Sequence, residues 1–290
     1  MATVPGCNGW RVSPVSPEDH GSSEPPPVVL GAFGVAGQRA VPLRGGLHLS
    51  WRVGDLVLKR ADLDDGELAW QARLLPRISC DGFRLAPWVA AADGSWSAHG
   101  WCATRYVAGR HERGRWAEIV AAGERLHAGL ASEPRPDFLD RRTGPWAVAD
   151  RVAWGEIPLS GSADVRHLPR LAAAMRPVTA QCQLIHGDLT GNVLFDDRLP
   201  PAIIDVAPYW RPAGYASAIV IADALVWEGA DDGVLGAAGH VDGIGQYLIR
   251  ALVFRLVSDW LLTRRPADRE DSRPWEHAVD LACAIAADDA

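Results

Sequence analysis

Residues 183–205 read QLIHGDLTGNVLFDDRLPPAIID, and this stretch decides the fold. Its apolar runs at 193–195 and 202–204 flank a polar turn, a pattern that predicts a β-hairpin. A hairpin brings the segments at its open end together. We therefore expect three polar residues to lie close to one another: Asp188, Asn192 and Asp205.

These side chains suit phosphoryl transfer to a hydroxyl. Mg²⁺ neutralises the charge of a triphosphate, and it takes oxygen ligands from one or two protein groups, phosphates and waters. Asp205 and the side-chain carbonyl of Asn192 would be the protein ligands, and Asp188 would accept the proton of the acceptor hydroxyl. His186 would brace the loop by hydrogen bonds. The competing interpretation is a polar hairpin whose Asp and Asn only serve turns.

The same stretch resembles a known family. His186-Gly187-Asp188, then Asn192, then a strand ending in Ile204-Asp205 is similar to the catalytic and metal-binding segments of the aminoglycoside phosphotransferase and choline kinase-like family, within the protein-kinase-like fold. The resemblance implies an α+β fold with Mg-ATP in the cleft between a small β-rich N-lobe and a larger, mainly helical C-lobe. It also implies a phosphotransferase that moves the γ-phosphate of ATP to a hydroxyl of a small molecule.

The chain divides in the same way by composition and pattern. Residues 1–27, rich in Pro, Ser and Gly, indicate a mobile leader. Strand patterns occupy residues 28–100, the expected nucleotide-binding N-lobe, and helical periodicity dominates residues 110–290. By resemblance, residues 101–109 would be the hinge.

Alternation and turn signals locate the individual elements. Strands are expected at 41–43, 49–53, 56–60, 83–91 and 100–107, with a tight turn at Gly54-Asp55 and a helix over 64–75. Apolar residues at helical spacing indicate core in the second part: Ile119, Ala122, Leu126, Leu130, Ile249, Val253, Leu256 and Trp260.

Lys59 is the only lysine among 29 basic residues, so a chain that otherwise uses arginine retains an ammonium at this position. By resemblance, Lys59 would hold the α- and β-phosphates, with Glu67 on the following helix as its partner. The alternatives are a surface lysine and a helix N-terminal acid favoured by the helix dipole. Asp64 and Asp65 compete with Glu67 for the same role.

Two further segments have places in the implied nucleotide site. Gly45 and Gly46 would belong to the loop that covers the phosphates, although the local sequence is a poor match to a Gly-rich signature and is equally typical of a hairpin turn. Hinge backbone groups at Thr104, Tyr106 and Val107 would pair with adenine.

The sequence departs from the family pattern at two points. Three residues, not four, separate Asp188 from Asn192, and Gly191 is expected to absorb the shortening through an unusual backbone conformation. Val206-Ala207-Pro208 follows Asp205 where the family has an aromatic residue and a glycine, which predicts a stiffer loop. Both departures support an alternative function, a weak or inactive kinase-like module that binds nucleotide.

Bulk properties exclude other classes. The net charge of −7 argues against a nucleic-acid surface, and the acidic excess after residue 110 favours a cationic acceptor. There is no apolar run long enough to span a membrane, no secretory signal and no Cys-x-x-Cys pair, so we expect a cytoplasmic protein. The expected partners are a nucleotide and a small-molecule acceptor. No Gly-x-Ser-x-Gly elbow indicates a hydrolase, and Asp223 and His127 are interpreted as structural.

Overall fold

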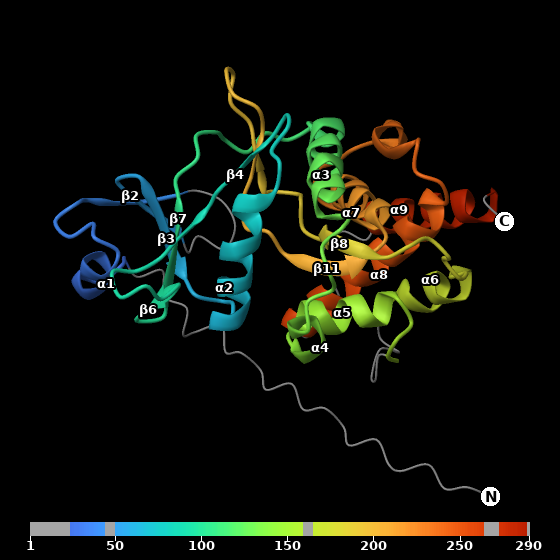
Figure 1. The fold of residues 1–290 in the computed structure, drawn as a ribbon. Helices are drawn as coiled ribbons and strands as arrows, with labels where there is room; N and C mark the ends of the chain where they lie inside the picture. The colour runs from blue at the N-terminus through green and yellow to red at the C-terminus, as the bar shows by residue number, and fades with distance from the viewer. Residues whose placement is uncertain (1–23, 44–49, 159–164, 264–272, 289–290) are drawn as a thin grey trace, which may run out of the picture.

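The computed structural model describes residues 24–43, 50–158, 165–263 and 273–288. Figure 1 shows a sheet-rich N-terminal part beside a helical C-terminal part, which confirms the α+β prediction. The expected phosphate-covering glycines Gly45 and Gly46 lie outside the described residues, as does most of the predicted leader. No helix within the described ranges is long and apolar enough to cross a membrane.

The N-lobe is built on an antiparallel sheet in the order β1-β2-β3-β7-β5, with β6 also paired to β7. The β2–β3 register pairs Val53 with Leu56, so Gly54 and Asp55 form the predicted two-residue turn, and Gly54 has a φ of 60°. The bounds are β1 Ala40–Pro42, β2 Ser50–Val53, β3 Leu56–Arg60, β5 Trp88–Val89, β6 Ser97–Ala98 and β7 Trp101–Arg105.

A short helix that the sequence analysis did not predict covers this sheet. Helix α1 (Pro27–Ala32) begins at the last residue of the predicted leader, and its Val29 is fully buried in the N-lobe core with Phe33 and Val35. Proline is favoured at the first helical position because its missing N–H would be unpaired there anyway, so Pro27 was the available signal.

Helix α2 (Asp65–Leu74) is the predicted helix after Lys59, and a one-turn helix η1 (Leu75–Arg77) extends it. The side chain of Asp64 caps it by accepting a hydrogen bond from the Glu67 amide at 2.8 Å. The helix buries Glu67 and Gln71 along with its apolar residues, which turns both polar side chains toward the C-lobe.

The strand expected at 100–107 is present as β7 (Trp101–Arg105), which overlaps the first part of the segment that the resemblance implied as the hinge. Residues 101–105 are strand β7, which is paired with β3 on one side and with β5 and β6 on the other. Trp101, Cys102 and Ala103 are buried, so this run is a core strand, and only 106–109 connect the lobes without regular pairing. Gly109 (φ 143°) ends the connection. A Cβ atom added to Gly109 would lie 2.8 Å from the Cβ atom of Leu194, so a larger residue would not fit there.

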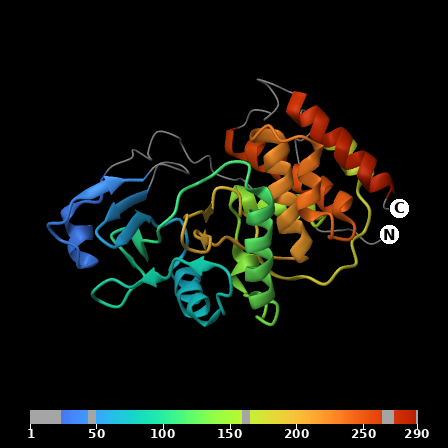
Figure 2. The same cartoon turned by 90° about the horizontal axis from the view of Figure 1, so that it is seen from above.

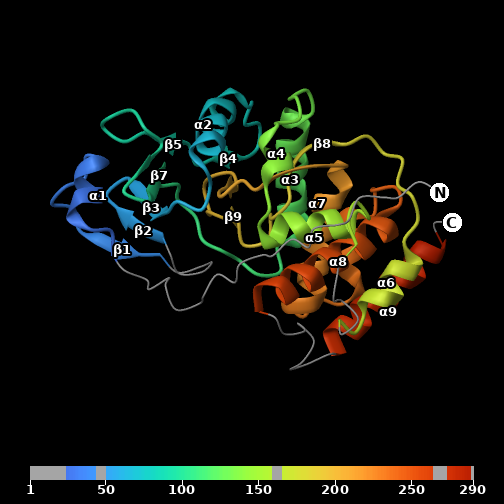
Figure 3. The ribbon, with the colours of Figure 1, turned by 90° about the horizontal axis from the view of Figure 1, so that it is seen from below.

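The C-lobe packs its helices around α7 and α8, both buried over most of their length. Figures 2 and 3 show these two helices inside the lobe, with α6 beside α9 at the end remote from the N-lobe. The bounds are α3 Trp116–Leu130, α4 Phe138–Arg141, α5 Pro145–Ala153, α6 Leu168–Ala174, α7 Ala213–Trp227, η3 Asp232–Ala238, α8 Ile244–Thr263 and α9 Arg273–Asp288.

Two small sheets carry the decisive stretch. Strand β9 (Val193–Leu194) pairs antiparallel with β10 (Ala202–Ile203), which confirms the predicted hairpin. Strand β4 (Arg84–Leu85) pairs with β10, so the expected strand at 83–91 is split and its first part joins the C-lobe hairpin. Strand β8 (Gln183–His186) pairs with β11 (Pro208–Arg211), which places the loops after His186 and before Pro208 side by side.

Candidate functional site

Asp188 lies in the loop between β8 and β9, and its carboxylate is 45% exposed. The Asn192 side-chain amide donates to the Asp188 backbone carbonyl at 2.7 Å and approaches the carboxylate oxygen Oδ2 at 3.3 Å. Gly191 has a φ of 79°, the left-handed conformation predicted for the shortened loop. The loop therefore closes despite its missing residue, and Asn192 still faces Asp188.

Asp205 lies immediately beyond the hairpin, beside Asn192. The amide of Ile204 donates to the backbone carbonyl of Asn192 at 2.9 Å, which joins the two segments. Asp205 has a φ of 47°, a conformation that is uncommon for a residue with a side chain and that Asp tolerates better than most. Such strained backbone is concentrated at functional sites. The hairpin thus brings Asp188, Asn192 and Asp205 together, as the sequence predicted.

Lys59 reaches this group from the N-lobe. Its Nζ lies 2.7 Å from Asp205 Oδ1 and 3.7 Å from Asp62 Oδ1. Burial by itself would lower the pKa of the Lys59 ammonium, but the charges of Asp205 and Asp62 outweigh burial and raise it. The lysine is therefore fully charged at neutral pH, and it joins the two lobes at the candidate site.

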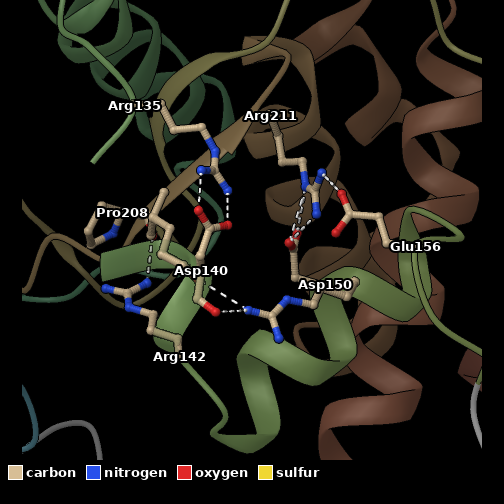
Figure 4. A network of polar contacts seen from close by, with 9 residues as sticks. Arg135, Asp140, Arg142, Asp150, Glu156, Pro208 and Arg211 are labelled. Carbon is tan, nitrogen blue, oxygen red and sulfur yellow. Dashed lines mark hydrogen bonds and ion pairs between the residues drawn. The ribbon is translucent and has the colours of Figure 1, made fainter. Parts of the chain in front are cut away.

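Glu67 does not pair with Lys59 in this structure. The carboxylate of Glu67, only 4% exposed, accepts hydrogen bonds from Arg142 just after α4, and Arg142 also donates to the Pro208 carbonyl at 2.7 Å. Figure 4 shows the Arg142 guanidinium directed at Pro208. The ion pair of Glu67 therefore anchors α2 to the C-lobe, and this corrects the expectation that Glu67 holds Lys59.

Hydrogen bonds hold consecutive residues of the loop after Asp205. Gln71 Nε2 donates to the Val206 carbonyl at 3.1 Å, and the amide of Ala207 donates to His186 Nδ1 at 3.2 Å. The same His186 nitrogen accepts from the Asp188 amide at 3.2 Å, and burial lowers the pKa of its imidazole. A neutral His186 therefore acts as a two-way acceptor that braces both functional loops, and the 206–208 segment is held as the sequence predicted for a stiff loop.

Gly187 is required by close packing. A Cβ at this position would lie 2.4 Å from the Tyr209 ring, which itself packs edge-to-face on Phe254 at 6.0 Å. We predict that Gly187→Ala lowers the free energy of unfolding by about 1–3 kcal/mol, because the ring must move within a packed core. Urea denaturation measures this.

Gly31→Ala is the matched control for that substitution, because no atom lies within 4 Å of the added methyl and the site is helical. It is expected to leave stability unchanged or to raise it by up to about 1 kcal/mol. Equal effects of the two substitutions would contradict the packing argument.

The three residues predicted to contact adenine differ in their backbone pairing. Thr104 is paired within the sheet to Val57 and Trp88 on its two sides. The Tyr106 amide donates to the Asp55 carbonyl at 2.8 Å, so the amide of Tyr106 is already paired within the N-lobe. Val107 forms no backbone hydrogen bond with any described residue, and it remains the predicted adenine contact.

Sequence reasoning missed the arginines that connect the site. Arg142 binds Glu67, and Arg255 of α8 donates from Nη2 to Asp188 Oδ1 at 2.9 Å. Arg255 is a single charge inside the apolar run Ala251–Val257, and a charge in such a run signals a buried, paired group. Asp223, expected to be structural, is the second partner of Arg255.

The residues present fit a divalent cation. The amide nitrogen of Asn192 is committed to Asp188, which leaves its carbonyl oxygen available as a ligand. Asp205 supplies a partly exposed carboxylate, and it follows Ile204, whose amide is hydrogen-bonded to the Asn192 backbone carbonyl. Over the described ranges, no cluster of three or more His, Cys, Asp or Glu residues could enclose a metal, so phosphates and waters would complete the coordination.

Solved structures match the fold of this chain, whereas no family model and no curated protein matches it. A thermostable mutant of aminoglycoside phosphotransferase APH(4)-Ia, in its apo form, aligns with a TM-score of 0.55 at 14% identity, over 91% of this chain and 98% of that chain. Spectinomycin phosphotransferase APH(9)-Ia, in complex with ADP and spectinomycin, aligns with a TM-score of 0.53 at 14% identity, over 89% and 95%.

A third structure, the GDP and kanamycin complex of APH(2'')-IIIa, aligns with a TM-score of 0.53 at 15% identity, over 90% of this chain and 97% of that chain. The likeness extends over nearly the whole of each protein, so both lobes and their connection correspond. At this level of identity the correspondence is one of fold. The chain has the protein-kinase-like fold of the aminoglycoside phosphotransferases.

Proposed function

We propose that this protein is a phosphotransferase that moves the γ-phosphate of Mg-ATP to a hydroxyl of a small molecule. The observation that carries the proposal is one continuous set of contacts from the N-lobe to the C-lobe: Lys59 on Asp205, Asp205 joined through Ile204 to Asn192, and Asn192 on Asp188. A fold-level likeness to nucleotide-bound aminoglycoside phosphotransferases supports it.

Asp188 is the proposed general base. Its partly exposed carboxylate accepts the proton of the acceptor hydroxyl while that oxygen forms a bond to the γ-phosphorus. The bond between the γ-phosphorus and the bridging oxygen breaks, and ADP leaves with the electron pair. Asn192 keeps the loop closed on Asp188, and neutral His186 holds both loops in register throughout.

In the nucleotide complex, Lys59 would contact the negatively charged phosphates and Asp205 would contact the positively charged metal ion. The Lys59 ammonium would neutralise the α- and β-phosphates, and the Asp205 carboxylate and Asn192 carbonyl would hold Mg²⁺, which screens the phosphate charge. Their mutual ion pair at 2.7 Å keeps both side chains paired before nucleotide arrives. Because Glu67 is paired with Arg142, Lys59 is oriented by Asp205, its nearer carboxylate, and by Asp62 at 3.7 Å.

The acceptor is proposed to be a cationic small molecule bearing hydroxyl groups, because the acidic excess lies in the C-lobe part of the sequence. Three compounds bound by the structural neighbours are the first acceptors to test: spectinomycin, hygromycin B and kanamycin. We place the reaction in the cytoplasm, where ATP is present and thiols such as Cys80 and Cys182 stay reduced.

Thermal denaturation with nucleotide tests the proposal. We expect Mg-ATP to raise the melting temperature of the parent, since a ligand at 100 times its Kd stabilises the native state by about 2.7 kcal/mol. Asp205→Ala should abolish the difference between ATP with Mg²⁺ and ATP without it. Comparing ligand-induced shifts removes the baseline effect of taking Asp205 away from Lys59.

Asp197→Ala is the control, since that carboxylate is 82% exposed and pairs only with Arg110 among the described residues. It should keep the full magnesium-dependent shift. A parent that responds to neither ATP nor GTP at millimolar concentration would contradict the proposal. A parent that binds Mg-ATP but turns over no faster than Asp188→Ala would instead be the nucleotide-binding module considered from the sequence.

A further inference from the structure

A buried guanidinium connects Asp188 to the interior of the C-lobe. Arg255 Nη2 donates to Asp188 Oδ1 at 2.9 Å and to Asp223 Oδ2 at 2.6 Å, and its Nε donates to Asp223 Oδ1 at 2.7 Å. Asp223 lies on α7 and Arg255 on α8, and their side chains are only 2% and 9% exposed. One arginine therefore links a buried carboxylate to the partly exposed one at the cleft.

The fork of hydrogen bonds to Asp223 leaves Arg255 little rotational freedom. Two parallel N–H donors bind both oxygens of one carboxylate, which fixes the plane of the guanidinium as well as its position. Trp227, four residues after Asp223 on α7, has its ring 5.6 Å from the guanidinium carbon. Since α7 and α8 form the buried centre of the lobe, Arg255 is held on a rigid support and its Nη2 is aimed at Asp188.

The contacts on Asp188 divide between its two oxygens. Oδ1 accepts from Arg255, and Oδ2 faces the Asn192 amide at 3.3 Å. Each carboxylate oxygen has two lone pairs, so both remain able to accept from a further donor such as an acceptor hydroxyl. A carboxylate held at both oxygens is restricted in its rotation, yet the Asp188 side chain stays partly exposed to solvent.

We propose that the Asp223–Arg255 pair is a positioning device that orients the Asp188 carboxylate for proton abstraction. This inference rests on the proposed phosphotransferase function and adds two residues that do not touch the reacting atoms. A misplacement of about 1 Å from a distant change can lower a rate about 100-fold, which sets the scale of the expected effect.

The same lobe contains a matched pair with no link to Asp188. Arg211 binds both oxygens of Asp150, with Nη2 at 2.6 Å, and it also binds Glu156; Figure 4 shows this group of contacts. The Arg211 and Asp150 side chains are 11% and 9% exposed, close to the values for Arg255 and Asp223. Asp150→Asn thus reproduces the structural loss of Asp223→Asn at a pair that does not contact the base.

The test is a kinetic comparison of Asp223→Asn, Arg255→Lys and Asp150→Asn in the full chain. The probe is Mg-ATP with whichever of kanamycin, hygromycin B or spectinomycin the parent phosphorylates, or with water as acceptor if none is used. We expect Asp223→Asn and Arg255→Lys to lower kcat by about 10- to 100-fold with KM for ATP within about 3-fold. Asp150→Asn should leave kcat within about 2-fold in the folded fraction.

A double variant separates positioning from general damage. In an Asp188→Asn background, Asp223→Asn should cause no further fall in kcat, because there is no base left to orient. Equal losses with Asp150→Asn and Asp223→Asn, or a full additional loss in the Asp188→Asn background, would overturn the positioning role. Should Asp223→Asn fail to fold, Arg255→Lys, which keeps a cation beside Asp223, carries the same comparison.

The failure of this inference differs from a failure of the proposed function. If the parent turns over no faster than Asp188→Asn, both the proposed reaction and the positioning role are overturned. A parent that turns over, loses activity in Asp188→Asn and retains full kcat in both Asp223→Asn and Arg255→Lys overturns the positioning role alone.

Discussion

Asp188→Asn is expected to lower kcat by about 10²- to 10⁴-fold, the range that a general base contributes, with little change in KM for ATP. The substitution keeps the size of the side chain and the acceptor for Arg255, since the amide oxygen can take the place of Oδ1. It removes the negative charge and with it the ability to accept a proton. Initial rates of ADP formation with and without acceptor measure the effect.

Asp197→Asn, the same chemical change in an exposed carboxylate of the 196–198 turn, serves as the control for that prediction. Its kcat should equal that of the parent, because this turn lies at the far end of the hairpin from Asp188. Parent-like turnover in Asp188→Asn would show that another group, or none, removes the proton.

Breaking the ion pair of Glu67 and Arg142 is expected to lower the free energy of unfolding by about 3 kcal/mol, near the lower end for a buried pair because Arg142 is 22% exposed. In Arg142→Met the Glu67 carboxylate loses its cation inside the protein, and the Pro208 carbonyl loses its donor. Urea denaturation of the single variants measures the loss. Since these contacts join α2 to the loop after Asp205, the affinity for Mg-ATP should fall as well.

The double variant Glu67→Met/Arg142→Met should recover most of the lost stability, because it removes both charges from the interior together. The exposed pair of Arg170 and Asp280 is the matched control, and its loss should change stability by no more than about 1 kcal/mol. A Glu67→Met variant as stable as an Asp280→Asn variant would contradict the anchoring role of Glu67.

Short-range patterns predicted the parts of the site that depend on neighbouring residues. The hairpin followed from two apolar runs around a polar turn, and the shortened loop with a glycine at 191 predicted the unusual backbone conformation that Gly191 adopts. The helix expected over 64–75 is α2, and the structure adds that the Asp64 side chain caps it. Each depends on backbone preferences and contacts within a few residues, which are visible in the sequence.

The errors concern choices among distant partners. Several acids follow Lys59, and the sequence could not show that Glu67 faces Arg142 rather than Lys59. The sequence pattern predicted a strand at 100–107 and the resemblance implied a hinge over 101–109, and only the pairing of Thr104 with β3 and β5 shows how far the strand extends. Arg255 was passed over within an apolar stripe, since only the packing of α7 against α8 brings it to Asp188.

The sequence by itself determined the order and spacing of His186, Asp188, Asn192 and Asp205, and the lone lysine that faces them. The four residues lie in or beside one hairpin, where local geometry sets which side chains meet, whereas tertiary structure brings Lys59 to Asp205 from 146 residues away. Tertiary structure alone decided which arginine meets which carboxylate: Arg142 on Glu67, and Arg255 on both Asp223 and Asp188. The physical reason is that a buried charge takes the partner that helix packing brings within about 3 Å, and that choice follows from the positions of whole elements rather than from neighbours in the chain.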